Sequence, residues 1–117
     1  MTNKTPIQVQ TTPRFRQVLK KLYKKYIHVA DDLKTLLELF AEGETPGDQI
    51  PDIGYSVYKV RLSNRDAQRG KSGGYRVIYY LKTRQRVILI DIYSKSDQVD
   101  ISADKIRRLI ADTSDEN

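Results

Sequence analysis

The sequence has no cysteine and a single histidine, His28. The absence of cysteine excludes disulfides, thiolate zinc sites and cysteine nucleophiles, and it agrees with a reducing cytosol. A single histidine excludes any mechanism that needs two imidazoles. Because His28 falls between two helical patterns, far in sequence from most of the basic residues, we interpret it as a structural or surface residue.

Long hydrophobic runs are also missing. No apolar stretch approaches the roughly 18 residues of a membrane span, and residues 1–12 are polar without a signal segment. We therefore expect a cytoplasmic protein with no membrane partner. With 117 residues, of which 38% are hydrophobic, the chain predicts one domain with a modest core. We divide it into an N-terminal arm (1–12) with a short edge strand, a domain (13–111) and an acidic tail (112–117).

Positive charge is concentrated in the middle of the chain. The protein carries a net charge of +6, but residues 59–95 contain ten Lys and Arg against only two acidic residues, Asp66 and Asp91. Such clustering favours a polyanionic partner, because Lys and Arg neutralise phosphates and release counterions. The alternative is that basic side chains simply keep a small domain soluble.

Helical periodicity dominates the first third of the sequence. Thr12 and Pro13 are typical of a helix N-cap and first position, and apolar residues then recur at helical spacing up to Tyr26. A second helical pattern runs from Ala30 to Phe40, and Gly43 is placed to end it. The two patterns predict a helical hairpin with one apolar side.

The period then changes from 3.6 to 2, after a loop rich in glycine and proline at 43–54. Residues 55–62, 75–81 and 87–93 predict three strands, the last two joined as an antiparallel hairpin through 82–86. A final helix begins at Ser102, with Ile101 and Ile106 spaced as a hydrophobic staple. The fold class is therefore α+β: a small antiparallel sheet with the helical hairpin and a short C-terminal helix on one face.

The usual catalytic motifs are absent. Gly70-Lys71-Ser72 lacks the upstream glycine of a phosphate-binding loop, since Arg65 stands there. A two-metal nuclease needs several carboxylates near the phosphate, and the basic region has two. The sequence predicts neither a metal site nor a cofactor.

Basic residues on the predicted strands remain as candidates. Lys59 and Arg61 alternate with apolar neighbours and project from one face of their strand. Arg76 lies in an otherwise apolar run, where an unpaired guanidinium is costly, so it has either an internal partner or a function on an open face. Lys95 follows the third strand. The alternative is a solvated sheet face with long side chains lying along it.

Such a cluster could cleave RNA without histidine or metal. Arginines provide fixed donors for a doubly charged phosphate transition state, and a lysine crowded by like charges becomes a candidate base for the ribose 2′-hydroxyl. Holding the RNA in line supplies further rate acceleration. RNA binding alone would require the same residues.

Three segments carry a family resemblance: 58–62 (Tyr-Lys-Val-Arg-Leu), 70–80 (Gly-Lys-Ser-Gly-Gly-Tyr-Arg-Val-Ile-Tyr-Tyr) and 90–95 (Ile-Asp-Ile-Tyr-Ser-Lys). With these segments the sequence resembles the RelE/HigB family of bacterial toxins from toxin–antitoxin systems, over residues 13 to 111. The 70–80 segment is the most specific part and indicates the HigB-like branch. The resemblance implies a microbial-ribonuclease-like fold and a ribosome-dependent, metal-independent mRNA endonuclease.

The resemblance also implies roles for particular residues. Lys59 and Arg61 match the pair that contacts the scissile phosphate and assists proton transfer, Arg76 matches the transition-state arginine, and Lys95 matches a further basic residue after the last strand. Some members stack a tyrosine on a base near the start of the last helix, where this chain has Ile101. The remaining candidates for contacts with RNA or the ribosome are Arg65, Arg69, Lys71, Arg84, and, for stacking, Tyr75 or Tyr93.

The implied partners are a cognate antitoxin, mRNA and the ribosome, with operator DNA reached only through the antitoxin complex. Two other classes remain open. One is a ParE-like toxin, which shares the fold but inhibits DNA gyrase and does not need Lys59, Arg61, Arg76 and Lys95 to converge. The other is a non-catalytic RNA-binding or interaction domain, whose variants would lose affinity only.

Overall fold

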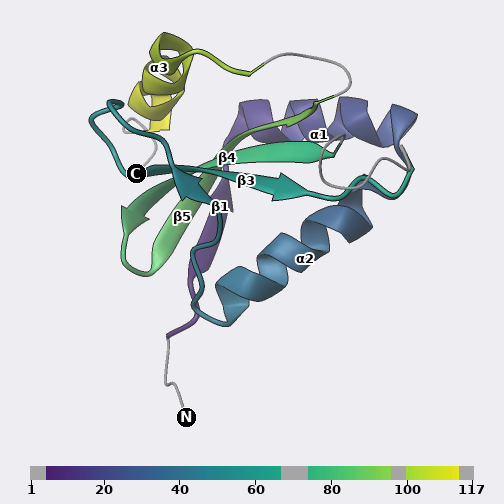
Figure 1. Cartoon of the computed structure of the whole chain (residues 1–117), viewed down its shortest axis with the longest axis horizontal. Coiled ribbons are helices and arrows are strands. Elements are labelled where there is room, and N and C mark those ends of the chain that lie inside the picture. The colour runs from purple at the N-terminus through teal and green to yellow at the C-terminus, as the bar shows by residue number, and fades with distance from the viewer. Residues whose placement is uncertain (1–4, 67–73, 96–99, 114–117) are drawn as a thin grey trace.

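Helices and strands in the computed structural model follow a β-α-α-β-β-β-β-α order (Figure 1). The structure describes residues 5–66, 74–95 and 100–113. Its elements are β1 (Gln8–Thr11), α1 (Pro13–Lys25), α2 (Val29–Ala41), β2 (Asp48–Gln49), β3 (Val57–Leu62), β4 (Tyr75–Thr83), β5 (Arg86–Ser94) and α3 (Ala103–Thr113). None of the helices within these ranges is both long enough and apolar enough to cross a lipid bilayer.

The five strands form one sheet in the order β1-β5-β4-β3-β2. The three predicted strands, β3, β4 and β5, are central and antiparallel to one another. Two details differ from expectation. The edge strand β1 pairs with β5 in parallel, and the glycine-rich loop contains β2, which pairs with Lys59 and Tyr58 of β3. The direction of β1 could not be predicted, because alternation of apolar residues indicates which face of a strand is buried and not how the strand pairs. The strand β2 could not be predicted, because two residues are too few to show a period.

Local signals set the ends of α1 and α2 as expected. The Thr12 side chain accepts a hydrogen bond from the Phe15 backbone N–H at 3.0 Å, with Pro13 at the first helical position. Gly43 ends the second helix with a φ of 83°, and its N–H donates to the carbonyl of Phe40. The two helices therefore form the predicted hairpin, which lies beside the sheet in Figure 1.

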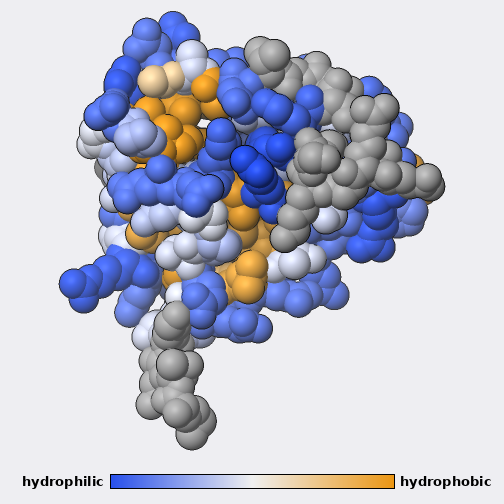
Figure 2. Space-filling view, in the orientation of Figure 1, coloured by the Kyte–Doolittle hydropathy of each residue, from blue (hydrophilic) through white to orange (hydrophobic). Residues whose placement is uncertain are grey.

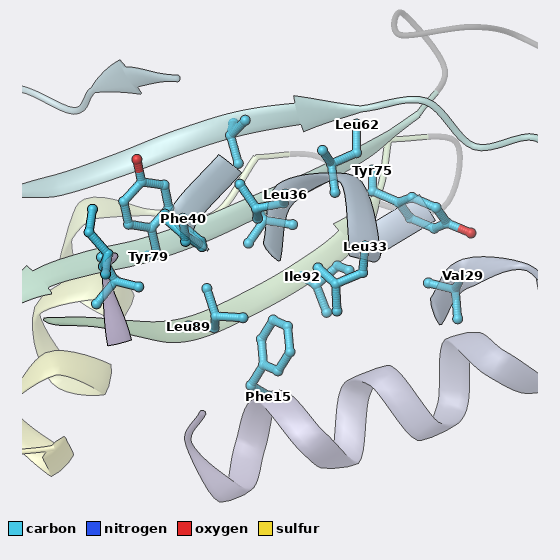
Figure 3. Close-up of a cluster of buried hydrophobic side chains, with 14 of the residues drawn as sticks. Phe15, Val29, Leu33, Leu36, Phe40, Leu62, Tyr75, Tyr79, Leu89 and Ile92 are labelled. Atoms are coloured by element: carbon cyan, nitrogen blue, oxygen red, sulfur yellow. The ribbon is translucent and has the colours of Figure 1, made fainter. Parts of the chain in front are cut away.

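The hairpin buries the larger of two hydrophobic clusters (Figure 3). Phe15 of α1 and Leu36 and Phe40 of α2 are at most 1% exposed and pack against the sheet. The Phe40 ring meets that of Tyr79 on β4 edge-on, with 5.0 Å between centroids. The apolar helical stripes of the sequence thus account for this face of the sheet.

The last helix covers the other face, which corrects the expectation of helices on one face only. Ile106 and Ile110 of α3 pack with Ile78, Ile90 and neighbouring residues in a second cluster. A signal for this was present, because β4 and β5 are near-continuous apolar runs, which are typical of strands buried on both faces. Figure 2 shows apolar surface next to α3 and a further apolar area near the centre of the view, on a face otherwise covered mostly by hydrophilic side chains.

The N-terminus of α3 is held as its sequence predicts. The Lys105 backbone N–H donates to the Ser102 hydroxyl at 3.2 Å, and Ile101 and Ile106 belong to the same cluster. The helix continues two residues past the expected boundary at residue 111, and Thr113 is buried.

Candidate phosphate-binding site

The sheet register brings the strand-borne arginines face to face. Arg61 on β3 is the direct cross-strand partner of Arg76 on β4, and Arg76 is in turn the partner of Tyr93 on β5. Lys59 lies two residues before Arg61 on the same side of β3. Four residues selected from the sequence thus share one face, at the end of the sheet where β4 begins and β5 ends.

Arg76 is almost fully buried, with 5% of its surface exposed. One guanidinium nitrogen, Nη1, lies 3.3 Å from the carbonyl oxygens of both Gly74 and Tyr75. These bonds hold the guanidinium close to the start of β4. A cation fixed in this way is suited to stabilising a negative charge, because it does not need to reorganise when the charge develops.

Lys59 and Lys95 meet at a carboxylate that the sequence reasoning missed. Oδ1 of Asp100 accepts hydrogen bonds from the Tyr93 hydroxyl at 2.9 Å and from Lys95 Nζ at 3.2 Å, and it lies 3.9 Å from Lys59 Nζ. A charge count along the chain places Asp100 only in the acidic C-terminal segment, residues 96–117. Its spacing from Lys95, five residues along the chain, is the one available signal, and it is a weak one.

The surroundings of Asp100 and Tyr93 shift the pKa values of these two groups in opposite directions. The hydrogen bonds from Tyr93 and Lys95, with the nearby Lys59 charge, lower the pKa of Asp100. Burial raises the pKa of Tyr93, and the hydrogen bond and charge of Asp100 raise it further. Asp100 is therefore an anion and Tyr93 a neutral hydroxyl at neutral pH. The sequence argument for a lysine base depended on crowding by like charges, and here the Asp100 carboxylate places an opposite charge beside Lys59 and Lys95.

Neither tyrosine selected for stacking on a base is positioned for that role. Tyr75 is fully buried on the opposite face, where its ring meets Tyr26 edge-on at 5.8 Å. Tyr93 is 2% exposed, and its hydroxyl bonds to Asp100. The structure thus removes Tyr75 from the site and leaves Tyr93 as a hydroxyl donor.

The other predicted contacts are dispersed. Arg65 donates from Nε to Asp32 on α2 at 2.9 Å, while about half of its side chain stays exposed. Arg84 lies in the β4–β5 turn at the far end of the hairpin, about 26 Å along β4 from Arg76 at 3.3 Å per residue. Arg69 and Lys71 lie outside the described residues.

A groove lies next to the site, and Lys59 and Arg61 of β3 belong to both. Its volume is about 600 Å³, and its charged lining consists of Asp32, Asp48, Lys59, Arg61 and Arg65. The pairing of β2 with β3 stops at Lys59, so the backbone of Arg61 borders the groove. The groove places further charged side chains next to the arginine pair.

The single histidine, His28, connects the turn between α1 and α2 to the loop that follows β3 through contacts with Asp66. His28 Nδ1 lies 2.7 Å from Oδ1 of Asp66, and the His28 backbone N–H donates to Oδ2 of the same carboxylate. These bonds lower the pKa of Asp66. The contact agrees with a structural role for His28. Among the residues described, no group of three or more potential ligands could hold a metal ion.

Comparison with known proteins concerns the family and the fold of the chain. Residues 17–114 match the family described as the RelE toxin of the RelE/RelB toxin–antitoxin system. The free-state structure of the Escherichia coli toxin RelE, in a mutant with two arginines replaced by alanine, is similar to this chain with a TM-score of 0.54. The two are 18% identical, and the match covers 77% of this chain and 84% of that one. At this identity the structural match supports the fold.

Proposed function

This chain belongs to the RelE family of toxins, and we propose that it is a ribosome-dependent mRNA endonuclease that inhibits translation. The observation that supports this proposal best is the convergence of Lys59, Arg61, Arg76 and Lys95 on one end of one sheet face. A toxin that acts only by binding gyrase has no need of such convergence.

The proposed reaction is attack by the ribose 2′-hydroxyl on the adjacent phosphate. The new bond from the 2′-oxygen to phosphorus forms as the bond to the 5′-oxygen of the next nucleotide breaks, which leaves a 2′,3′-cyclic phosphate. The hydroxyl proton passes to a phosphate oxygen or to water, and the leaving 5′-oxygen takes a proton from a lysine ammonium group. The transition state carries two negative charges, and Arg61 and Arg76 present two guanidinium groups from neighbouring strands to bind it. Arg76 is the transition-state residue in this proposal, because its burial and its carbonyl contacts fix its position. Neither metal nor cofactor takes part in this step.

Lys59 and Lys95 would act on the phosphate as ammonium groups. Because Asp100 faces both of them, we assign them charge stabilisation and proton donation in preference to proton abstraction. In-line positioning of the message on the ribosome would supply much of the remaining rate acceleration. The dependence on the ribosome then follows, since this small site offers no aromatic surface of its own, among the residues described, to grip a base.

The family implies an antitoxin as partner. We propose that the antitoxin covers the cationic face with acidic residues, and that operator DNA is bound only through that complex. Arg65, Arg69, Lys71 and Arg84 remain candidates for contacts with message or ribosomal RNA. A ribosomal target implies action in the cytoplasm.

Expression of the wild type and of Arg76→Ala in a bacterial host tests the proposal, with new 5′ ends mapped on translated mRNAs. We expect translation-dependent cuts with the wild type and none with Arg76→Ala. Arg108→Ala is the matched control, because Arg108 is an exposed arginine of α3 and its loss changes the net charge equally.

Two results would contradict the endonuclease. Growth arrest without new 5′ ends would favour gyrase inhibition, and neither arrest nor cuts would favour a binding domain. Cuts that persist in Arg76→Ala would leave the endonuclease in place but remove Arg76 from its site.

A further inference from the structure

A carboxylate lies among the cationic groups of the proposed site, where it would repel a phosphate. Asp100 precedes α3, and its Oδ1 contacts groups from two other segments: the Tyr93 hydroxyl and Lys95 Nζ at the end of β5, and Lys59 Nζ on β3. A surface that only binds RNA gains nothing from an acid in this position. The contacts therefore require an explanation other than affinity.

We propose that Asp100 is a positioning residue of the cleavage site, whose carboxylate holds the Lys59 and Lys95 ammonium groups beside the arginine pair. This inference rests on the proposed endonuclease function. It assigns to Asp100 a role in the rate of cleavage and none in contact with the reacting atoms.

The first step of the argument is that Asp100 is itself held in place. The Tyr93 ring is buried between the sheet and α3, so its hydroxyl is a fixed point at the edge of the site. The 2.9 Å bond from this hydroxyl fixes Oδ1 of Asp100. The rigid part of the fold thus determines where the carboxylate lies.

The second step is that the lysines need such an anchor. A lysine side chain has four rotatable carbon–carbon bonds and behaves as a mobile point charge, whereas Arg76 is already fixed by its backbone contacts. One carboxylate oxygen that attracts both ammonium groups restricts them to the same small region. Restricting catalytic groups before the substrate binds lowers the barrier of the chemical step.

The third step separates this role from stability and from base catalysis. About half of the Asp100 side chain is exposed, and exposed ion pairs contribute little to folding. Its pKa is lowered by its donors, which makes it a poor proton acceptor. The effect of removing its charge should therefore appear in the cleavage rate.

The experiment compares wild type, Asp100→Asn, Asp100→Glu and Asp104→Asn on programmed ribosomes, measuring single-turnover cleavage against ribosome concentration. Asp104 is the matched control, because it is an exposed acid of α3 that pairs with Arg107 outside the site. We expect Asp100→Asn to lower the saturating rate at least tenfold and to leave the half-saturating ribosome concentration within threefold. Asp100→Glu should recover part of the rate, and Asp104→Asn should stay within twofold of the wild type.

A second measurement reports the contact without cleavage. Carbon-13 labelling of tyrosine Cζ allows the Tyr93 hydroxyl to be titrated by NMR. Because the Asp100 charge raises the pKa of Tyr93, Asp100→Asn should lower it, while Asp104→Asn leaves it unchanged. Wild-type positions of the other tyrosine resonances in the same spectra establish that the variant is folded.

The outcomes distinguish this inference from the proposed function. Wild-type protein that cuts no message would overturn the endonuclease itself. If the wild type cleaves and Asp100→Asn cleaves at the same rate, Asp100 has no positioning role. A weaker ribosome affinity at an unchanged saturating rate, or an equal loss in Asp104→Asn, would likewise overturn the inference.

Discussion

Arg61 and Arg76 form a like-charged pair across β3 and β4, and this arrangement should cost the protein stability. The Leu81 N–H donates to the carbonyl of Ser56, so hydrogen-bonded pairs alternate along the two strands, and Arg61 with Arg76 is a non-hydrogen-bonded pair. Side chains come closest at such pairs, and like charges placed there are destabilising.

Replacing Arg61 by glutamine tests this reasoning. Glutamine keeps much of the exposed stem and removes the charge. Cross-strand pairs contribute about 0.2–1 kcal/mol, so the variant should gain about 0.5 kcal/mol, which corresponds to a rise in Tm of about 2 °C for a domain of this size. Cleavage should change in the other direction, because loss of one fixed donor to a developing oxyanion costs about 10²- to 10³-fold in rate.

Scanning calorimetry at low salt and at 1 M salt measures the stability part. The gain should shrink at 1 M salt, where the Debye length is about 3 Å. Arg108→Gln is the control, since it removes one exposed arginine from α3. A lower Tm for Arg61→Gln would show that Arg61 is a structural residue, and an equal rise in Arg108→Gln would show an effect of net charge. Either result would refute the argument from the cross-strand pair.

Further predictions concern the core, a helix cap, a buried acid and metal dependence. Phe40→Ala removes a fully buried ring that contacts Tyr79 and should lower the free energy of unfolding in urea by about 3–5 kcal/mol. Thr12→Ala removes the N-cap bond of α1 and should cost about 1 kcal/mol in the same assay. Burial raises the pKa of Asp91 above its ordinary 3.8, so the folded state binds more protons than the unfolded state as the pH rises from that value. The free energy of unfolding should therefore fall across this pH range. A pH series of urea melts should show this fall in the wild type and not in Asp91→Asn. Chelation of trace transition metals at constant magnesium should leave cleavage on ribosomes unchanged, and a strict requirement for added metal would contradict the mechanism.

Much of the fold was predictable because its signals are local. The Thr12 cap, the end of the second helix at Gly43 and the staple of Ile101 with Ile106 depend on residues a few positions apart. The central strands were predictable from runs of β-branched and aromatic residues. Parallel pairing of β1 and the two-residue β2 depend on contacts between distant segments, which periodicity does not report.

The candidate site divides in the same way. Lys59, Arg61 and Arg76 could be selected because their alternation within strands is local, and the register then placed them together. Tyr75, also selected from the sequence, is buried on the face opposite its neighbour Arg76, so adjacent residues of this strand face the core and the candidate site respectively. In a strand buried on both faces, composition alone does not distinguish the two sides.

Asp100 shows why counting charges along the chain misjudged the site. The sequence separates a basic middle third (59–95) from an acidic C-terminal segment (96–117), and this separation suggested an unopposed cationic surface. Because α3 packs on the face that carries the basic residues, the segment leading into it returns Asp100 to Lys59 and Lys95. The local charge is therefore smaller than the sequence count. RNA binding away from the ribosome should then be weaker and less dependent on salt than ten basic residues imply. Tight binding should require a partner, such as the ribosome, that holds the phosphate in the site despite its repulsion by Asp100.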